Sequence, residues 1–160
     1  MPVPLVAGLD YSTRALDLAV LGDGDQLIGL REFLLGADEA SKARVINTAL
    51  SWARDMGATC VFAERAFLAL GGKGKPAFRS SPTLTKLVGK LELVASLVPL
   101  KLEFVAVPTW KATILGNGRA DKAASLAYAE RNYGFRPASD NAADALCIAK
   151  FGQGRVLAYW

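Results

Sequence analysis

The chain has 160 residues, of which 52% are hydrophobic, and its 19 basic and 15 acidic side chains give a net charge of +4. This composition fits one domain over residues 1–160, and the lack of a signal peptide or of an apolar run of membrane-spanning length leads us to expect a cytoplasmic protein with no membrane partner. The chain has no histidine, which excludes Ser-His and Cys-His catalysis and every His-ligated zinc site.

The first part of the sequence predicts an antiparallel meander of three strands. The apolar run 3–9 ends at Asp10, and a second apolar run covers 15–21. Residues 22–25 are Gly-Asp-Gly-Asp, which is a hairpin turn signal before a third strand over 26–34.

Helices and strands alternate in the rest of the chain. A predicted helix over 38–56 leads to an apolar strand over 59–63 that ends at Glu64, and a continuous apolar run reached through a helix favours a buried parallel strand. The remaining predicted elements are a long helix from 82 to about 98, a strand over 102–107, and helices over 109–115, 120–133 and 140–151. This is the element order of the ribonuclease H-like fold, an α/β fold with a mixed five-stranded sheet, three strands antiparallel and two parallel, and helices on both faces.

Four acidic residues occupy positions where a site can form. Asp10 and Glu64 end strands that are neighbours in this topology, and Asp140 and Asp144 lie four residues apart on one face of an apolar helix. Four adjacent carboxylates cannot all be ionised without cations. Two Mg²⁺ or Mn²⁺ ions about 3.5–4 Å apart would neutralise them and support in-line phosphodiester cleavage. Each acid alone could instead be structural, for example Asp140 as a helix N-cap.

A block of positive charge without any acid extends from residue 65 to residue 90. A block of one sign favours a polyanion such as nucleic acid, although a solvated lysine-bearing face would have the same composition. The block consists of Arg65, Lys73, Lys75, Arg79, Lys86 and Lys90.

Four segments, in order, resemble the motifs of RuvC-type Holliday-junction resolvases. They are residues 8–14, 62–67, 108–122 and 142–149, and the resemblance covers nearly the whole chain. It implies a metal-dependent crossover junction endodeoxyribonuclease of recombination and repair. Such an enzyme is a homodimer that binds four-way DNA junctions and makes paired symmetric nicks that leave 5′-phosphate ends.

The chain departs from the family pattern at two places. Tyr11 and Ser12 replace the Pro-Gly of many bacterial members, and the short C-terminus favours a phage or mobile-element version without a helicase partner.

The resemblance also implies roles for single residues. Asp10, Glu64 and Asp144 match the catalytic, metal-binding acids. In many relatives the fourth acid lies three residues before the last, which here is Asn141. Asp140 lies four before it and keeps the same helical face, so we expect Asp140 as the fourth acid and Asn141 as the alternative.

Two lysines and an aromatic residue complete the matched positions. Lys111 and Lys122 match lysines that offset negative charge at the scissile phosphate, with ordinary solvated lysines as the alternative. Phe67 matches an aromatic that stacks on a base near the junction centre, and core packing is its alternative. Arg14 and Arg65 are expected phosphate contacts, beside the block residues Lys73, Lys75, Arg79 and Lys86.

Other readings stay open. The chemistry also suits a broader nuclease for branched or flap DNA, and the fold alone suits a non-catalytic junction-binding module. The sequence Gly-x-Asp-x-Ser-Thr at 8–13 also resembles the first phosphate loop of actin-like phosphotransferases. For a dimer interface, the candidates on the helix from 82 are Leu87, Gly89, Leu91 and Val94, with core burial as their alternative.

Overall fold

The computed structural model describes residues 2–65 and 82–159, so the predicted DNA contacts Phe67, Lys73, Lys75 and Arg79 lie outside the described residues. The five strands are β1 (Leu5–Tyr11), β2 (Ala15–Leu21), β3 (Leu27–Leu34), β4 (Ala58–Arg65) and β5 (Lys101–Ala106). The helices are α1 (Glu39–Asp55), α2 (Pro82–Leu97), α3 (Val107–Leu115), α4 (Lys122–Tyr133) and α5 (Asp140–Ala158), with a 3₁₀ turn, η1 (Asp23–Asp25), between β2 and β3.

The strands form one mixed sheet in the order β3-β2-β1-β4-β5. β1 pairs antiparallel with β2 and parallel with β4, while β2 pairs antiparallel with β3, and β4 pairs parallel with β5. The predicted ribonuclease H-like sheet is therefore confirmed, and its central strand β1 has the predicted neighbour β4. None of the described helices is both long enough and apolar enough to cross a membrane.

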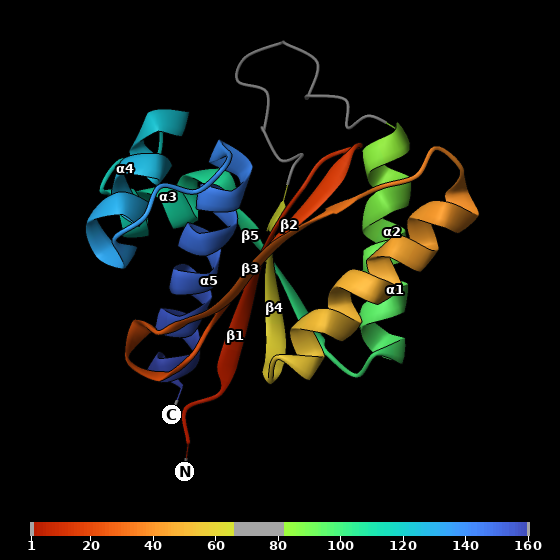
Figure 1. Cartoon of the computed structure of the whole chain (residues 1–160), viewed down its shortest axis with the longest axis horizontal. Helices are drawn as coiled ribbons and strands as arrows, with labels where there is room; N and C mark the ends of the chain where they lie inside the picture. Colours follow the sequence, from red (N-terminus) through yellow and green to blue (C-terminus); the bar gives the residue numbers. More distant parts are fainter. Residues whose placement is uncertain (1, 66–81, 160) are drawn as a thin grey trace, which may run out of the picture.

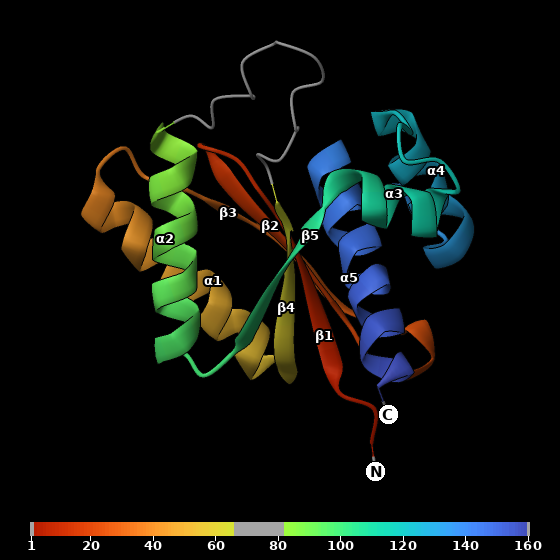
Figure 2. The same cartoon turned by 180° about the vertical axis from the view of Figure 1, so that it is seen from behind.

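Helices cover both faces of the sheet (Figures 1 and 2). α1 and α2 lie together on one face, over a core that includes Leu9, Leu18 and Leu50. α5 lies on the other face, packed against Phe62 and Val6, with α3 and α4 outside it. Because both faces are covered, all seven residues of β2 are buried.

The centre of α5 rests directly on β1. A Cβ atom at Gly8 would lie 2.1 Å from the carbonyl oxygen of Ala145 and 2.2 Å from the backbone nitrogen of Ala149. Only a glycine allows backbone and helix to approach this closely. Gly8 therefore fixes the distance between the first strand and the helix that carries two of the predicted acids.

Two predicted features differ from the structure. α5 continues to Ala158 rather than ending near 151, because the face that continues through Gly152 packs on the sheet, where a Cβ would lie 2.3 Å from the ring of Phe62. On α2, Leu87, Leu91 and Val94 are buried in the core, so the alternative of core burial holds for these three dimer candidates.

Candidate acidic active site

Four adjacent strands each place one acid in a single row across the sheet. Asp10 on β1 is paired in register with Asp17 on β2, which is paired in turn with Glu32 on β3. Glu64 follows the last paired positions of β1 and β4, Leu9 and Ala63. Residues opposite each other on neighbouring strands point to the same face. The row faces α5, because Ala19 and Phe62, two residues from Asp17 and Glu64, pack in the clusters formed with that helix.

The N-terminal end of α5 brings two more acids over this row. Ser139 caps the helix by accepting a hydrogen bond from the backbone N–H of Ala142 at 3.1 Å. Asp140 and Asp144 lie on the first two turns of α5. Figure 1 shows the start of this helix at the end of the sheet where β1 and β4 finish. The cluster thus contains the four acids predicted from the sequence. It also contains Asp17, which was not predicted.

The acids of the cluster raise one another's pKa values. Burial, followed in order of size by the charges of Glu64, Asp144, Asp17 and Asp140, raises the pKa of Asp10 from 3.8 to about 8. Burial likewise raises the pKa of Asp17 to about 6, with contributions from Glu32 and Asp140. A carboxyl group whose pKa is raised by burial and by neighbouring acids marks a place where a cation would be bound favourably.

Asp144 and Glu64 have neutral hydrogen-bonding groups beside them. The buried hydroxyl of Ser125, on α4, donates to Asp144 Oδ1 at 2.5 Å. The buried indole N–H of Trp110, on α3, lies close enough to lower the pKa of Glu64, although its nitrogen has no hydrogen-bond partner of ordinary geometry among the described residues. Burial nevertheless raises the pKa of both carboxyls.

Both predicted lysines lie at the cluster. Lys122 Nζ forms an ion pair with Asp140 Oδ2 at 3.0 Å, which lowers the pKa of Asp140 and raises that of the lysine. Lys111 is half-buried, donates to the carbonyl oxygen of Ala120 at 2.9 Å, and lies 5.6 Å from the ring centroid of Trp110. Its charge lowers the pKa of Glu64 and of Asp144.

The described basic candidates are exposed. Arg14 lies in the turn after β1, where its backbone N–H donates to Ser12 Oγ at 3.1 Å. Arg65 ends β4, directly after Glu64, and Lys86 lies on the first turns of α2. Figure 1 shows the end of β4 and the start of α2 at the same end of the sheet as the start of α5.

Sequence reasoning missed Asp17, Ser125 and Trp110. One signal for Asp17 was available, since it is the only charged residue in the otherwise apolar run 15–21. Ser125 and Trp110 give no comparable signal, because their contacts depend on how α3 and α4 pack beside α5.

The donor set suits a hard divalent cation. The cluster offers carboxylate oxygens and no histidine, which is the ligand type of Mg²⁺ and Mn²⁺ sites. Within residues 2–65 and 82–159, no three acidic or cysteine side chains are already gathered closely enough to hold an ion. The described residues therefore fit a cation by chemistry and charge, although three of them are not gathered around one point in this structure.

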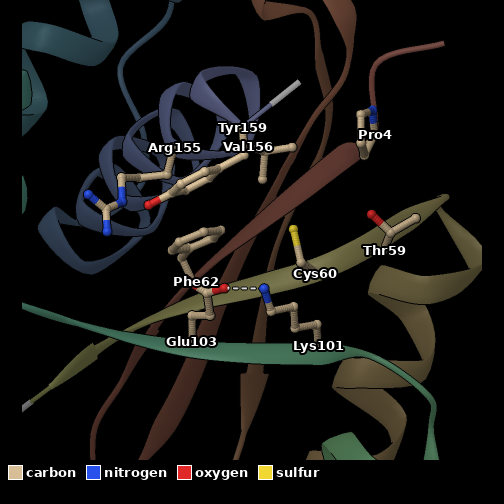
Figure 3. A pocket seen from close by; sticks show the side chains of 9 residues that line it. All are labelled: Pro4, Thr59, Cys60, Phe62, Lys101, Glu103, Arg155, Val156 and Tyr159. Carbon is tan, nitrogen blue, oxygen red and sulfur yellow. Dashed lines mark ion pairs between the residues drawn. The ribbon is translucent and has the colours of Figure 1, made fainter. Parts of the chain in front are cut away.

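A separate cavity of about 360 Å³ is lined by residues near both ends of the chain, among them Pro4 and Tyr159 (Figure 3). Figure 1 shows the two termini at the end of the sheet opposite the start of α5. Figure 3 shows Phe62, Cys60 and Tyr159 around it, with an ion pair of 2.6 Å between Lys101 and Glu103 at its edge. None of the clustered acids lines this cavity, so it is no part of the acidic site.

Comparison with known proteins identifies the fold. No family model matches the chain, and no curated protein matches its sequence. Among solved structures, RuvC from Thermus thermophilus aligns with a TM-score of 0.73 and 17% identity over 96% of each chain. The same protein in complex with a Holliday junction substrate aligns equally well, over 96% of this chain and 97% of that one. Fowlpox virus resolvase, bound to its substrate Holliday junction DNA, aligns with a TM-score of 0.57 and 14% identity over 96% and 99%. The likeness to RuvC expected from the motifs is thus confirmed for the fold.

Proposed function

We propose that this protein is a metal-dependent endonuclease that resolves four-way DNA junctions. The observation that carries the proposal is the cluster of Asp10, Glu64, Asp140 and Asp144, from two neighbouring strand ends and the start of the helix that crosses them. The shared fold of RuvC and of fowlpox virus resolvase, both solved with Holliday junction DNA, supports the choice of substrate.

The four acids are proposed to hold two Mg²⁺ or Mn²⁺ ions. When bound, the ions would supply the activated water and the positive charge that in-line cleavage of a phosphodiester needs. Asp140 is the better candidate than Asn141 for the fourth ligand, because its negative charge already reaches Asp10 and Asp144. Ser125 would hold Asp144 in one orientation through its hydrogen bond.

Two lysines are proposed to bind the scissile phosphate. Lys111 is fixed in place by the carbonyl of Ala120 and the ring of Trp110, so its charge is preorganised beside the acids. Lys122 is 82% exposed, and when a cation takes Asp140 its ammonium group becomes free to contact DNA. The exposed Arg14, Arg65 and Lys86 would extend the contact along the phosphate backbone.

We also propose a homodimer that uses the solvent face of α2. Leu93 and Leu97 are 61% and 73% exposed, and they lie four residues apart on that face. Gly89 precedes them by the same spacing, and a Cβ there would meet no atom within 4 Å. A second copy of α2 could therefore pack closely at Gly89 and cover both leucines. Two such subunits would present two sites for paired nicks.

A junction-cleavage assay with end-mapped products tests the proposal. Wild type should make paired nicks with 5′-phosphate ends in Mg²⁺ or Mn²⁺ and none in chelator. Asp10→Asn should bind the junction without cutting it, while Asp23→Asn, which removes an exposed acid away from the site, should cut normally. Undiminished cutting by Asp10→Asn would refute the assignment.

The same assay separates the other readings. Equal cutting of forks and three-way junctions would favour a broader branched-DNA nuclease. Junction binding without nicking under any divalent metal would favour a non-catalytic module, and ATP binding would favour a phosphotransferase.

A further inference from the structure

Asp17 is a buried carboxyl group without a partner. It is 3% exposed, is the third residue of a strand whose seven residues are all buried, and has no hydrogen bond or ion pair to any described residue. A buried carboxylate is costly unless it is paired or coordinates a cation. A residue type this unfavourable in a core strand calls for a compensating group.

Asp17 borders a cavity and lies beside other acidic residues. Asp17 lines a cavity of about 310 Å³ together with Glu32, Ser139 and Ala142. Its cross-strand neighbours are Asp10 on one side and Glu32 on the other. Asp140, one residue after Ser139, adds negative charge that raises the pKa of Asp17.

The guanidinium group of Arg31, the basic residue that lines the cavity, does not neutralise Asp17. Arg31 also lines the cavity, but its guanidinium carbon lies 4.9 Å from the ring centroid of Phe33. The Phe33 ring packs in the core on the face of α1 and α2, whereas Asp17 faces α5. The arginine head group is thus directed away from the carboxyl group, which leaves room for an external cation.

We propose that Asp17 is a fifth carboxylate of the acidic site and binds a divalent cation between the β2 position of Asp17 and the start of α5 at Asp140. This deepens the proposed function and rests on it, since the same cluster must be a cation site. Asp17 would act beside Asp10, either as a direct ligand or by orienting the water of a bound ion. Its role is therefore to set cation affinity.

Titration with Mn²⁺ alone, followed by calorimetry, tests this role without relying on catalysis. Asp17→Asn should weaken Mn²⁺ binding at least tenfold and should raise the melting temperature of the metal-free protein, because a buried acid is removed. Asp23→Asn, an equal change of charge at an exposed site, should alter neither. A purely structural Asp17 would change the melting temperature and leave Mn²⁺ affinity unaltered, and that result would overturn the proposal.

Two further arms keep the test decisive. Asp17→Ser, which is smaller and neutral, replaces the asparagine variant if the latter does not fold, and its Mn²⁺ affinity is judged by the same criterion. Junction cleavage by the wild type is measured in parallel. If the wild type binds Mn²⁺ through Asp17 but cuts no junction, the proposed function fails while the cation site stands.

Discussion

Asp10→Asn should stabilise the metal-free protein even as it abolishes cleavage. The pKa of Asp10 rises from 3.8 to about 8 in the fold, because the carboxyl group is buried among other acids. Between these two pH values the folded state holds a proton that the unfolded state has lost. The free energy of unfolding therefore falls as pH rises through this range, by about 1.4 kcal/mol per pH unit.

At pH 7 the accumulated loss is about 4 kcal/mol, because pH 7 lies about three pH units above the ordinary pKa of 3.8. Asparagine cannot ionise in either state, so Asp10→Asn should recover most of this energy. For a chain of this length that corresponds to a rise in melting temperature of roughly 8–16 °C at pH 7. The gain should shrink to nothing near pH 4, where Asp10 is protonated in both states.

Urea denaturation in chelator, at several pH values from 4 to 8, measures the effect directly. Asp23→Asn is the control, because that acid is exposed and outside the cluster. Adding Mg²⁺ should reverse the order, since the wild type gains stability by binding the ion and the variant does not. The electrostatic reasoning fails if Asp10→Asn is less stable than wild type at pH 7 in chelator, or if its gain is the same at every pH.

Three other outcomes follow from the structure. Gly8→Ala should lower the free energy of unfolding, measured in urea, by about 3 kcal/mol or more, because the new Cβ would lie 2.1 Å from a backbone oxygen of α5. Gly154→Ala, on α5 itself, is the control. It should be neutral or slightly stabilising, because a Cβ there has no atom within 4 Å. Equal stability of the two variants would contradict the close contact. Lys111→Met should slow nicking about 10²–10³-fold with little change in junction affinity, and a change below threefold in single-turnover rate would exclude Lys111 from the phosphate site. Leu97→Asp should convert a dimer to a folded monomer in light scattering, because Leu97 is 73% exposed, and an intact dimer would place the interface elsewhere.

Much of the fold can be predicted from the sequence because each element carries a local signal. Asp38 and Ser139 are helix N-caps in the structure, and both stand directly before apolar periodic segments. The acids Asp10 and Glu64 were predictable because each follows an apolar strand. The position of Lys111 and Lys122 beside the acids could be predicted only from the family resemblance, since nothing in their local sequence sets them apart from solvated lysines.

The rest of the site depends on packing between distant elements. The bond from Ser125 to Asp144 exists only because α4 lies against α5, and no spacing in the sequence encodes that contact. Asp17 was missed for a different reason. β2 is buried on both faces, so its sequence has no alternation from which the direction of one charged side chain could be deduced.

The contact of α5 with Gly8 also bears on the order in which the chain can fold during synthesis. Asp10, Asp17 and Glu64 leave the ribosome long before residues 140–158, so the strands can pair while the face of the sheet that carries the acids is still uncovered. That face contains Val6, Phe62 and Ala19, which would meet water until the last helix arrives. A nascent chain therefore completes its apolar core and its acidic cluster in the same late step, and an incomplete chain should aggregate rather than cut DNA.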